Sequence, residues 1–293
     1  MKIKMLFALL FVLGNITAQE FSDSSRLTYM KDVVTYLASD SLEGRASGSK
    51  GEKLAADFIG VKFSKNKRCK VTRQNFSFRI DSANYNSQNV LCFINNGAAK
   101  TVLIMAHYDH IGWGGTLSKS SGIHAVHKGA DDNASGVALM LDLVRLLPPT
   151  KAKCNYLFVA FSGHELGLFG SKYFSEHLSS KYKKIAITIN LDMVGRMDGE
   201  GTLYYDCTPD QENRMDTLVN ITSDLKIKKS TSDRINILDS KWFAEKNIPG
   251  ITFTTGMHSD YHKISDDVQY INFAGMLKVE KFIISYLNRL KFY

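Results

Sequence analysis

The stretch Val102-Leu103-Ile104-Met105-Ala106-His107-Tyr108-Asp109 decides the fold of this chain. Its first five residues are all apolar, which is typical of a strand whose sheet is covered on both faces. His107 and Asp109 follow where that strand should end. Strands of this kind occur in α/β proteins, in which ligands bind beyond the carboxyl ends of the strands. The stretch therefore predicts both an architecture and the place of a site.

Further along the chain in both directions, more apolar runs alternate with segments of helical periodicity. We expect core strands at residues 156–161, 185–191 and 251–254, and outer strands at 71–80 and 90–94. Helices are expected at residues 26–38, 51–63, 135–147, 168–178, 210–225, 240–246 and 273–290, and a glycine-rich loop at 112–129. This order predicts an α/β fold, a three-layer α/β/α sandwich around a mostly parallel, mixed sheet.

Residues 1–18 have the pattern of a secretory signal peptide. Lys2 and Lys4 precede a short apolar stretch at residues 6–12, and small residues follow it. The stretch is too short to span a bilayer, and the alternative is a buried first helix. We therefore expect an exported protein, periplasmic or secreted, with one domain at residues 19–293 and no stable membrane insertion.

The charge pattern argues against a nucleic-acid partner. The formal net charge is +8, or 8 − 2 = +6 without Lys2 and Lys4. The basic residues are scattered, and the densest runs, at residues 65–68 and 226–229, contain no aromatic side chains. Runs of this kind are usually solvated surface.

Four cysteines, Cys69, Cys92, Cys154 and Cys207, show no metal-clip spacing. An exported chain could pair them, and the sequence does not settle the pairing. Cys92 and Cys154 lie in or beside apolar runs, where a buried free thiol is the usual state.

Five side chains that can bind metal lie at or just beyond strand ends or at the start of a helix. They are His107, Asp132, Glu165, Asp192 and His262. Two imidazoles and three carboxylates suit zinc, and one carboxylate can bridge two ions. Each has an ordinary alternative, because strand-end polar groups are usually satisfied by hydrogen bonds and Asp131 and Asp132 could cap the next helix. Their common position favours a metal site.

Five segments surround these residues. They are Ala106-His107-Tyr108-Asp109-His110, Gly129-Ala130-Asp131-Asp132-Asn133-Ala134-Ser135-Gly136, Glu165-Leu166-Gly167-Leu168-Phe169-Gly170-Ser171, Asn190-Leu191-Asp192-Met193-Val194-Gly195-Arg196 and Tyr261-His262-Lys263-Ile264-Ser265-Asp266. Together, in this order, they resemble the motifs of the secreted co-catalytic zinc aminopeptidases. That family shares its fold with glutaminyl cyclases and glutamate carboxypeptidases, so the resemblance implies that the α/β fold is of the zinc-dependent exopeptidase type. Residues 37–45 also resemble bacterial members.

The resemblance implies two Zn²⁺ ions per chain and a role for each candidate ligand. It implies that Asp132 bridges the ions. His107 and Asp192 would complete one site, and Glu165 and His262 would complete the other.

The resemblance also implies roles for three neighbouring residues. Asp109 would orient His107 and fix its tautomer. Tyr261 matches a tyrosine that in some relatives donates a hydrogen bond to an oxyanion, and the alternative is a packed wall residue. His164 departs from the pattern. The resemblance implies a glutamate at this position in active relatives, where it is the general base.

Three interpretations of His164 stay open. The imidazole replaces the missing base, since it titrates near neutrality. Alternatively, the protein is a slow or inactive relative, and His164 could bind a metal itself. In the third, Asp109 or His110 is the base.

The favoured function is that of a zinc-dependent aminopeptidase, an exopeptidase that hydrolyses N-terminal residues from peptides with water activated by two metal ions. Its partners would be peptides with a free N-terminus, and we expect a monomer. One alternative is a weak or inactive relative that binds metal or peptide. Glutaminyl cyclisation is less favoured, because it relies on an acidic residue at position 164.

Overall fold

The apolar run at 102–106 forms the middle of strand β3 in the computed structural model, as predicted. The structure describes residues 21–147, 154–219, 225–231 and 236–290. Its strands are β1 (Cys69–Ile80), β2 (Ala83–Ile94), β3 (Lys100–His107), β4 (Asn155–Phe161), β5 (Lys184–Leu191), β6 (Thr202–Cys207), β7 (Lys226–Lys229) and β8 (Gly250–Thr254). They form one eight-stranded sheet in the order β1-β2-β4-β3-β5-β8-β6-β7, which places β3 and β5 near its centre.

The sheet is mixed, as predicted. β3 is parallel to β4 and β5, β5 to β8, and β6 to β7. β2 is antiparallel to β1 and β4, and β6 is antiparallel to β8. Because β3, β4, β5 and β8 run in the same direction, their carboxyl ends meet at one side of the sheet. His107 is the last residue of β3.

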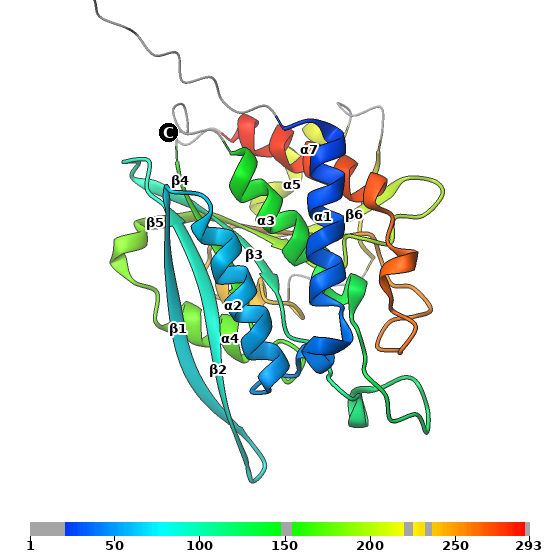
Figure 1. The fold of residues 1–293 in the computed structure, drawn as a ribbon. Helices are drawn as coiled ribbons and strands as arrows, with labels where there is room; N and C mark the ends of the chain where they lie inside the picture. The colour runs from blue at the N-terminus through cyan, green and yellow to red at the C-terminus, as the bar shows by residue number, and fades with distance from the viewer. Residues whose placement is uncertain (1–20, 148–153, 220–224, 232–235, 291–293) are drawn as a thin grey trace, which may run out of the picture.

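Helices cover both faces of the sheet. They are α1 (Asp23–Leu37), α2 (Lys50–Ser64), α3 (Gly136–Leu146), α4 (Phe169–Glu176), α5 (Glu212–Val219), α6 (Lys241–Ala244) and α7 (Phe273–Arg289). Figure 1 shows α1, α2 and α3 over one face, where their apolar side chains share a core with those of α7. Phe174 of α4 and Phe243 of α6 belong to a second core on the opposite face. Neighbours in β3 divide between these cores, Ile104 in the first and Leu103 in the second. The predicted three-layer α/β/α architecture is confirmed.

Serine caps fix where the first two helices begin. The Ser22 side chain accepts a hydrogen bond from the Ser25 backbone N–H at 3.2 Å, and Ser49 accepts one from Glu52 at 3.1 Å. Such caps satisfy N–H groups that have no partner within the helix. Both helices therefore start earlier than their apolar periodicity alone predicts.

Two strands on one side of the sheet were not predicted. The run at residues 226–229, expected to be solvated surface, forms β7, in which only Ile227 is buried. β6 lies between β7 and β8 and also lacked a predicted counterpart. The helix expected at 210–225 is observed as a short 3-10 turn followed by α5, and residues 220–224 lie outside the described residues. The expected signal peptide at residues 1–18 also lies outside them.

The cysteines follow the expectation in part. Cys154 is a buried free thiol as expected, and so is Cys207. Cys92 instead forms a disulfide with Cys69. The antiparallel register of β1 and β2 places Cys69 opposite Ile94, two residues from Cys92, and this pairing could not be read from the apolar run around Cys92. Within the described residues, no helix has the length and hydrophobicity needed to cross a bilayer.

Candidate metal centre

His107 marks one side of a cluster of donor groups at the carboxyl ends of the core strands. Its Nε2 lies 3.3 Å from Asp132 Oδ1 and 3.7 Å from Asp192 Oδ2. Its Nδ1 lies 3.2 Å from the backbone oxygen of Asp109. The fold therefore brings His107, Asp132 and Asp192 together and leaves one ring nitrogen directed at the two carboxylates.

Asp132 stands between two imidazoles. Its Oδ1 faces His107, and its Oδ2 lies 3.3 Å from Nε2 of His262. The Asp266 carboxylate accepts the backbone N–H groups of Asp131 and Asp132 at 3.0–3.1 Å, which holds this turn in place. Neither aspartate caps α3, which begins without a side-chain cap. The capping alternative for Asp131 and Asp132 is therefore wrong.

A second group of donors forms around Glu165. Its Oε2 lies 3.1 Å from Nε2 of His262, and its Oε1 lies 3.0 Å from Nδ1 of His110. The donor atoms of His110, Asp132, Glu165 and His262 all lie within 4.8 Å of one another. His262 adopts a left-handed backbone conformation with φ of 58°, and its Nδ1 lies 3.1 Å from the Leu117 carbonyl. The sequence suggested His110 only as an alternative base. Its position among the possible metal ligands was not predicted.

A third group contains His164. Donor atoms of His107, His164 and Asp192 lie within 4.8 Å of one another. The rings of His107 and His164 stack, with centroids 3.7 Å apart and planes 6° from parallel. Nδ1 of His164 lies 2.9 Å from Oδ2 of the fully buried Asp239, just before α6. Asp239 lies outside every motif and strand end recognised in the sequence, so no signal there pointed to it.

Asp109 holds the turn that carries His164 and Glu165. One of its carboxylate oxygens accepts the His164 N–H at 3.2 Å, and the other accepts the Glu165 N–H at 3.3 Å and the Ser47 hydroxyl at 2.8 Å. The nearer contact to His107 Nδ1 comes from the Asp109 backbone oxygen, since the carboxylate lies 3.7 Å away. The Asp109 carboxylate therefore holds the next ligand-bearing turn, and the role expected for it in orienting His107 stays a prediction.

The half-buried Tyr261 packs on a candidate ligand. Its ring stacks on His262 with centroids 3.9 Å apart, and Lys119 Nζ lies 4.0 Å from its ring centroid. The expected hydrogen bond from its hydroxyl to an oxyanion stays a prediction.

Arg45 explains why residues 37–45 belong with the other motifs. Its fully buried guanidinium donates to the carbonyls of Tyr108, Lys128 and Gly129 at 2.7–3.0 Å. It thus ties the end of β3 to the segment that leads into Asp132.

The donor set fits metal ions. Four of its buried atoms have no hydrogen-bond partner and lie close to one another: His107 Nε2, His262 Nε2, Asp132 Oδ2 and Asp192 Oδ2. An unsatisfied buried polar group costs about 1–3 kcal/mol, so the grouping of four such atoms favours a bound cation. Nitrogen and carboxylate oxygen are suitable zinc ligands.

The pKa shifts report the same concentration of negative charge. Burial lowers the pKa of His262, but the adjoining carboxylates of Asp132 and Glu165 outweigh burial and raise it to about 10. Burial and the charge of Asp132 raise the pKa of Glu165, but His110 and His262 outweigh them and lower it to about 2. Without another cation, the carboxylates therefore keep the imidazoles of His107 and His262 protonated, since they raise the pKa of both.

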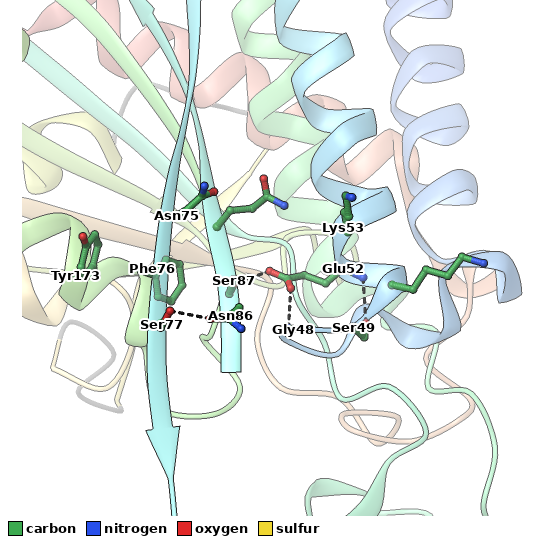
Figure 2. Close-up of a pocket in the computed structure, with 12 residues that line it drawn as sticks. Gly48, Ser49, Glu52, Lys53, Asn75, Phe76, Ser77, Asn86, Ser87 and Tyr173 are labelled. Atoms are coloured by element: carbon green, nitrogen blue, oxygen red, sulfur yellow. Dashed lines mark hydrogen bonds between the residues drawn. The ribbon is translucent and has the colours of Figure 1, made fainter. Parts of the chain in front are cut away.

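A separate hollow of about 740 Å³ lies between α2 and the β1–β2 hairpin (Figure 2). Its described lining residues include none of the candidate metal ligands. Glu52 on its wall accepts hydrogen bonds from the Gly48 N–H at 2.6 Å and the Ser87 hydroxyl at 2.5 Å (Figure 2). It also accepts one from the Tyr108 hydroxyl at 3.0 Å. Because Tyr108 follows His107, Glu52 braces the end of β3 from behind the centre.

Fold and donor cluster together define the class of protein, an α/β protein with a candidate metal centre at the carboxyl ends of its core strands. The sequence profile of peptidase family M28 matches residues 89–287, more than half of the chain. The chain therefore belongs to peptidase family M28.

Individual relatives agree with this assignment. Aminopeptidase YwaD of Bacillus subtilis (strain 168) is 27% identical over 206 residues, which cover 68% of this chain and 42% of that protein. The chain thus spans less than half the length of this curated relative.

Solved structures share the fold. BSAP, a zinc aminopeptidase from Bacillus subtilis, has a TM-score of 0.74 and 17% identity over 90% of this chain and 96% of its own. A glutaminyl cyclase from Bacteroides thetaiotaomicron, bound to N-acetylhistamine, has a TM-score of 0.78 and 18% identity over 94% of this chain and all of its own. Because aminopeptidase and cyclase share this fold, the fold alone does not choose between the two activities.

Proposed function

We propose that this protein is a zinc-dependent exopeptidase that removes N-terminal residues from peptides at a centre for two metal ions. The observation that carries the proposal is the grouping of four buried, unsatisfied donor atoms, from His107, Asp132, Asp192 and His262, at the strand ends. Asp132 lies between His107 and His262, the position a bridging carboxylate needs. We also propose that the protein is exported and acts as a monomer.

The candidate ligands divide into two sets that share Asp132. His107 and Asp192 belong to one set, and Glu165 and His262 to the other, which His110 joins. When bound at such a centre, divalent ions polarise a carbonyl and lower the pKa of water to near neutrality.

The chain's own residues hold this centre in shape. Asp266 fixes the Asp132 turn through two backbone N–H groups, and Asp109 fixes the turn that carries Glu165. The carboxylates around the centre can also bind the free amine of a peptide N-terminus. This selects for substrates with an unblocked first residue.

The test is the release of chromophore from a panel of aminoacyl chromogenic amides. Protein stripped with a chelator should be inactive, and zinc should restore release from free but not from N-acetylated substrates. Asp132→Asn should stay inactive with zinc, while a change at the exposed His177, His177→Ala, should behave as wild type. A lack of turnover with zinc or cobalt across a broad panel would refute the proposal. Ammonia loss from a peptide with N-terminal Gln, seen by mass spectrometry, would instead indicate cyclisation.

A further inference from the structure

A second hollow, of about 290 Å³, lies where β1 begins and β2 ends, and its wall is basic. Arg68, Lys70 and Lys181 line it, and none of its described lining residues is acidic. Positive charges gathered without a carboxylate repel one another, and an anion bound among them relieves that repulsion. This basic hollow therefore has the charge of an anion site.

The sheet fixes one side of the basic hollow. Lys70 and Thr72 lie two residues apart in β1, so both side chains point to the same face of the sheet. Lys70 pairs in register with Phe93 of β2, and the Cys69–Cys92 disulfide joins the two strands beside this pair. These lining groups therefore stand on paired strands, which hold them in place better than a flexible loop would.

Aromatic rings and partial burial make the basic hollow less aqueous than an open surface. Phe93 and Tyr182 are buried in the second core, and their rings meet edge to face with centroids 5.3 Å apart. Lys181 Nζ lies 4.8 Å from the Tyr182 ring centroid. Burial lowers the pKa of Arg68, whose guanidinium is half-buried. A charge partly withdrawn from water attracts an anion more strongly than a fully solvated one does.

The donor groups suit phosphate better than carboxylate. Besides its three basic side chains, the wall offers the hydroxyl of Thr72 and the amide of Asn95. A carboxylate brings two oxygens and one negative charge, whereas a phosphate monoester brings three acceptor oxygens and nearly two charges at neutral pH. Arginine and lysine are the usual side chains that bind phosphate.

More lysines lie at the same end of the sheet. Lys183 and Lys184 follow Lys181 in the chain, and Lys100 at the start of β3 pairs in register with Lys184 at the start of β5. Such a concentration of one charge attracts anions over a distance of about a Debye length. The surrounding lysines would therefore draw an anion towards the basic hollow.

We propose that the basic hollow is a binding site for a phosphate group, presented either by free phosphate or by a phospholipid headgroup. The site is separate from the metal centre: the end of β2 pairs with the start of β4, where Ile94 lies opposite Tyr156, whereas the candidate metal ligands lie beyond the carboxyl ends of the strands. A bound phosphate therefore leaves the metal centre open. The inference does not rest on the proposed exopeptidase activity.

Isothermal titration calorimetry of the zinc-loaded protein with inorganic phosphate tests the proposal. Lys70→Gln and Lys181→Gln should each weaken phosphate binding by about tenfold, the usual effect of losing one hydrogen bond to a charged group. The matched control is Lys278→Gln, at an exposed position of α7, which should bind phosphate as the wild type does.

Two results would overturn the proposal. One is wild-type phosphate affinity in both Lys70→Gln and Lys181→Gln. The other is phosphate binding that disappears entirely when a chelator removes zinc, because the phosphate would then sit on the metal ions.

Vesicles identify the source of the phosphate. Cosedimentation compares vesicles of phosphatidylcholine alone with vesicles that also contain phosphatidic acid, whose headgroup is a phosphate monoester. Binding to the phosphatidic acid vesicles that Lys70→Gln and Lys181→Gln weaken, and Lys278→Gln does not, would identify a lipid headgroup. Calorimetric binding of phosphate without vesicle binding would identify free phosphate.

Activity separates this inference from the proposed function. Release of chromophore from aminoacyl amides should stay at the wild-type level in Lys70→Gln and Lys181→Gln, because the basic hollow lies at the opposite end of the core strands from the metal centre. A protein that binds phosphate through these lysines but cleaves no amide would refute only the exopeptidase proposal.

Discussion

At the scale of single residues, His164→Glu would place a carboxylate at the position where the family motif has a glutamate. We expect kcat on aminoacyl amides to rise by about 10²-fold, because a positioned general base contributes about 10²–10⁴-fold. Asp239→Asn added to this variant should raise kcat further, since a second buried carboxylate would otherwise hold the new one protonated. Steady-state kinetics at saturating zinc measure both effects. A fall in kcat for His164→Glu would mean that the imidazole is the working base.

A glycine close to the centre offers a second residue-scale prediction. Gly129 has φ of 57°, and a Cβ there would lie 2.6 Å from the His110 ring and would also collide with the Asp132 carbonyl. Gly97 has φ of 76° and nothing within 4 Å of such a Cβ. Gly97→Ala should cost about 1–2 kcal/mol for its left-handed conformation alone.

We expect Gly129→Ala to cost more than Gly97→Ala and to weaken zinc binding, because the added methyl group displaces His110. Urea unfolding with and without zinc measures both quantities. Equal losses of stability in the two variants, with unchanged zinc affinity, would show that the close approach at Gly129 does not matter.

The site residues that could be predicted from the sequence lie near apolar runs, whereas those that could not depend on tertiary packing. His107 ends an apolar strand, Asp192 directly follows one, and Glu165 comes after one with three residues between, so the end of each run pointed to them. Asp239 follows no such run, and its contact with His164 arises only when distant segments pack. His110 lay within a recognised motif, yet only the folded loop directs its ring towards Glu165.

At the scale of elements, α1, α3 and α7 meet around a buried pair of carboxyl groups. Glu280 and Asp142 are both fully buried, and one oxygen of each has no hydrogen-bond partner. Arg26 binds Glu280 at 2.5 Å, and Arg145 binds Asp142 at 2.5 Å. Burial raises the pKa of Glu280 to about 8, and the charge of Asp142 adds to burial while Arg26 opposes it.

This pair predicts that stability falls as pH rises. Between about pH 4.5 and 8 the folded state binds more protons at Glu280 than the unfolded chain does, so the free energy of unfolding decreases through that window. Glu280→Gln should reduce this decrease by an amount on the order of a few kcal/mol. Urea unfolding at about pH 5 and about pH 8.5 measures the difference. The exposed Glu176→Gln should leave it unchanged, and a Glu280→Gln protein with the wild-type pH slope would contradict the prediction.

How well a strand could be predicted from the sequence depended on how much of it is buried. Strands buried on both faces, such as β3, are apolar throughout and stand out in the sequence. β7 buries a single side chain, Ile227, among lysines, so its pattern could not be told from surface charge. Its place depends on pairing with β6, which is a tertiary property.

At the scale of the whole molecule, the candidate centre joins segments that are distant in the chain. Its ligands come from the end of β3, the turn before α3, and the segments after β4, β5 and β8. The sheet order brings β4, β3, β5 and β8 side by side, so these segments emerge next to one another. Bound ions would therefore cross-link much of the fold.

This arrangement predicts that metal stabilises the entire domain. Zinc at about 100 times its dissociation constant should add about 2.7 kcal/mol per site to the free energy of unfolding, because it binds the folded state and the unfolded chain lacks the assembled centre. For a domain of this size, that corresponds to a rise in Tm of about 5–10 °C per site. Scanning calorimetry of chelated and zinc-loaded protein measures the rise, and Asp132→Asn, which lacks the carboxylate between the two sets, should show little of it. An identical Tm for the wild type with and without zinc would mean that no ion joins these segments.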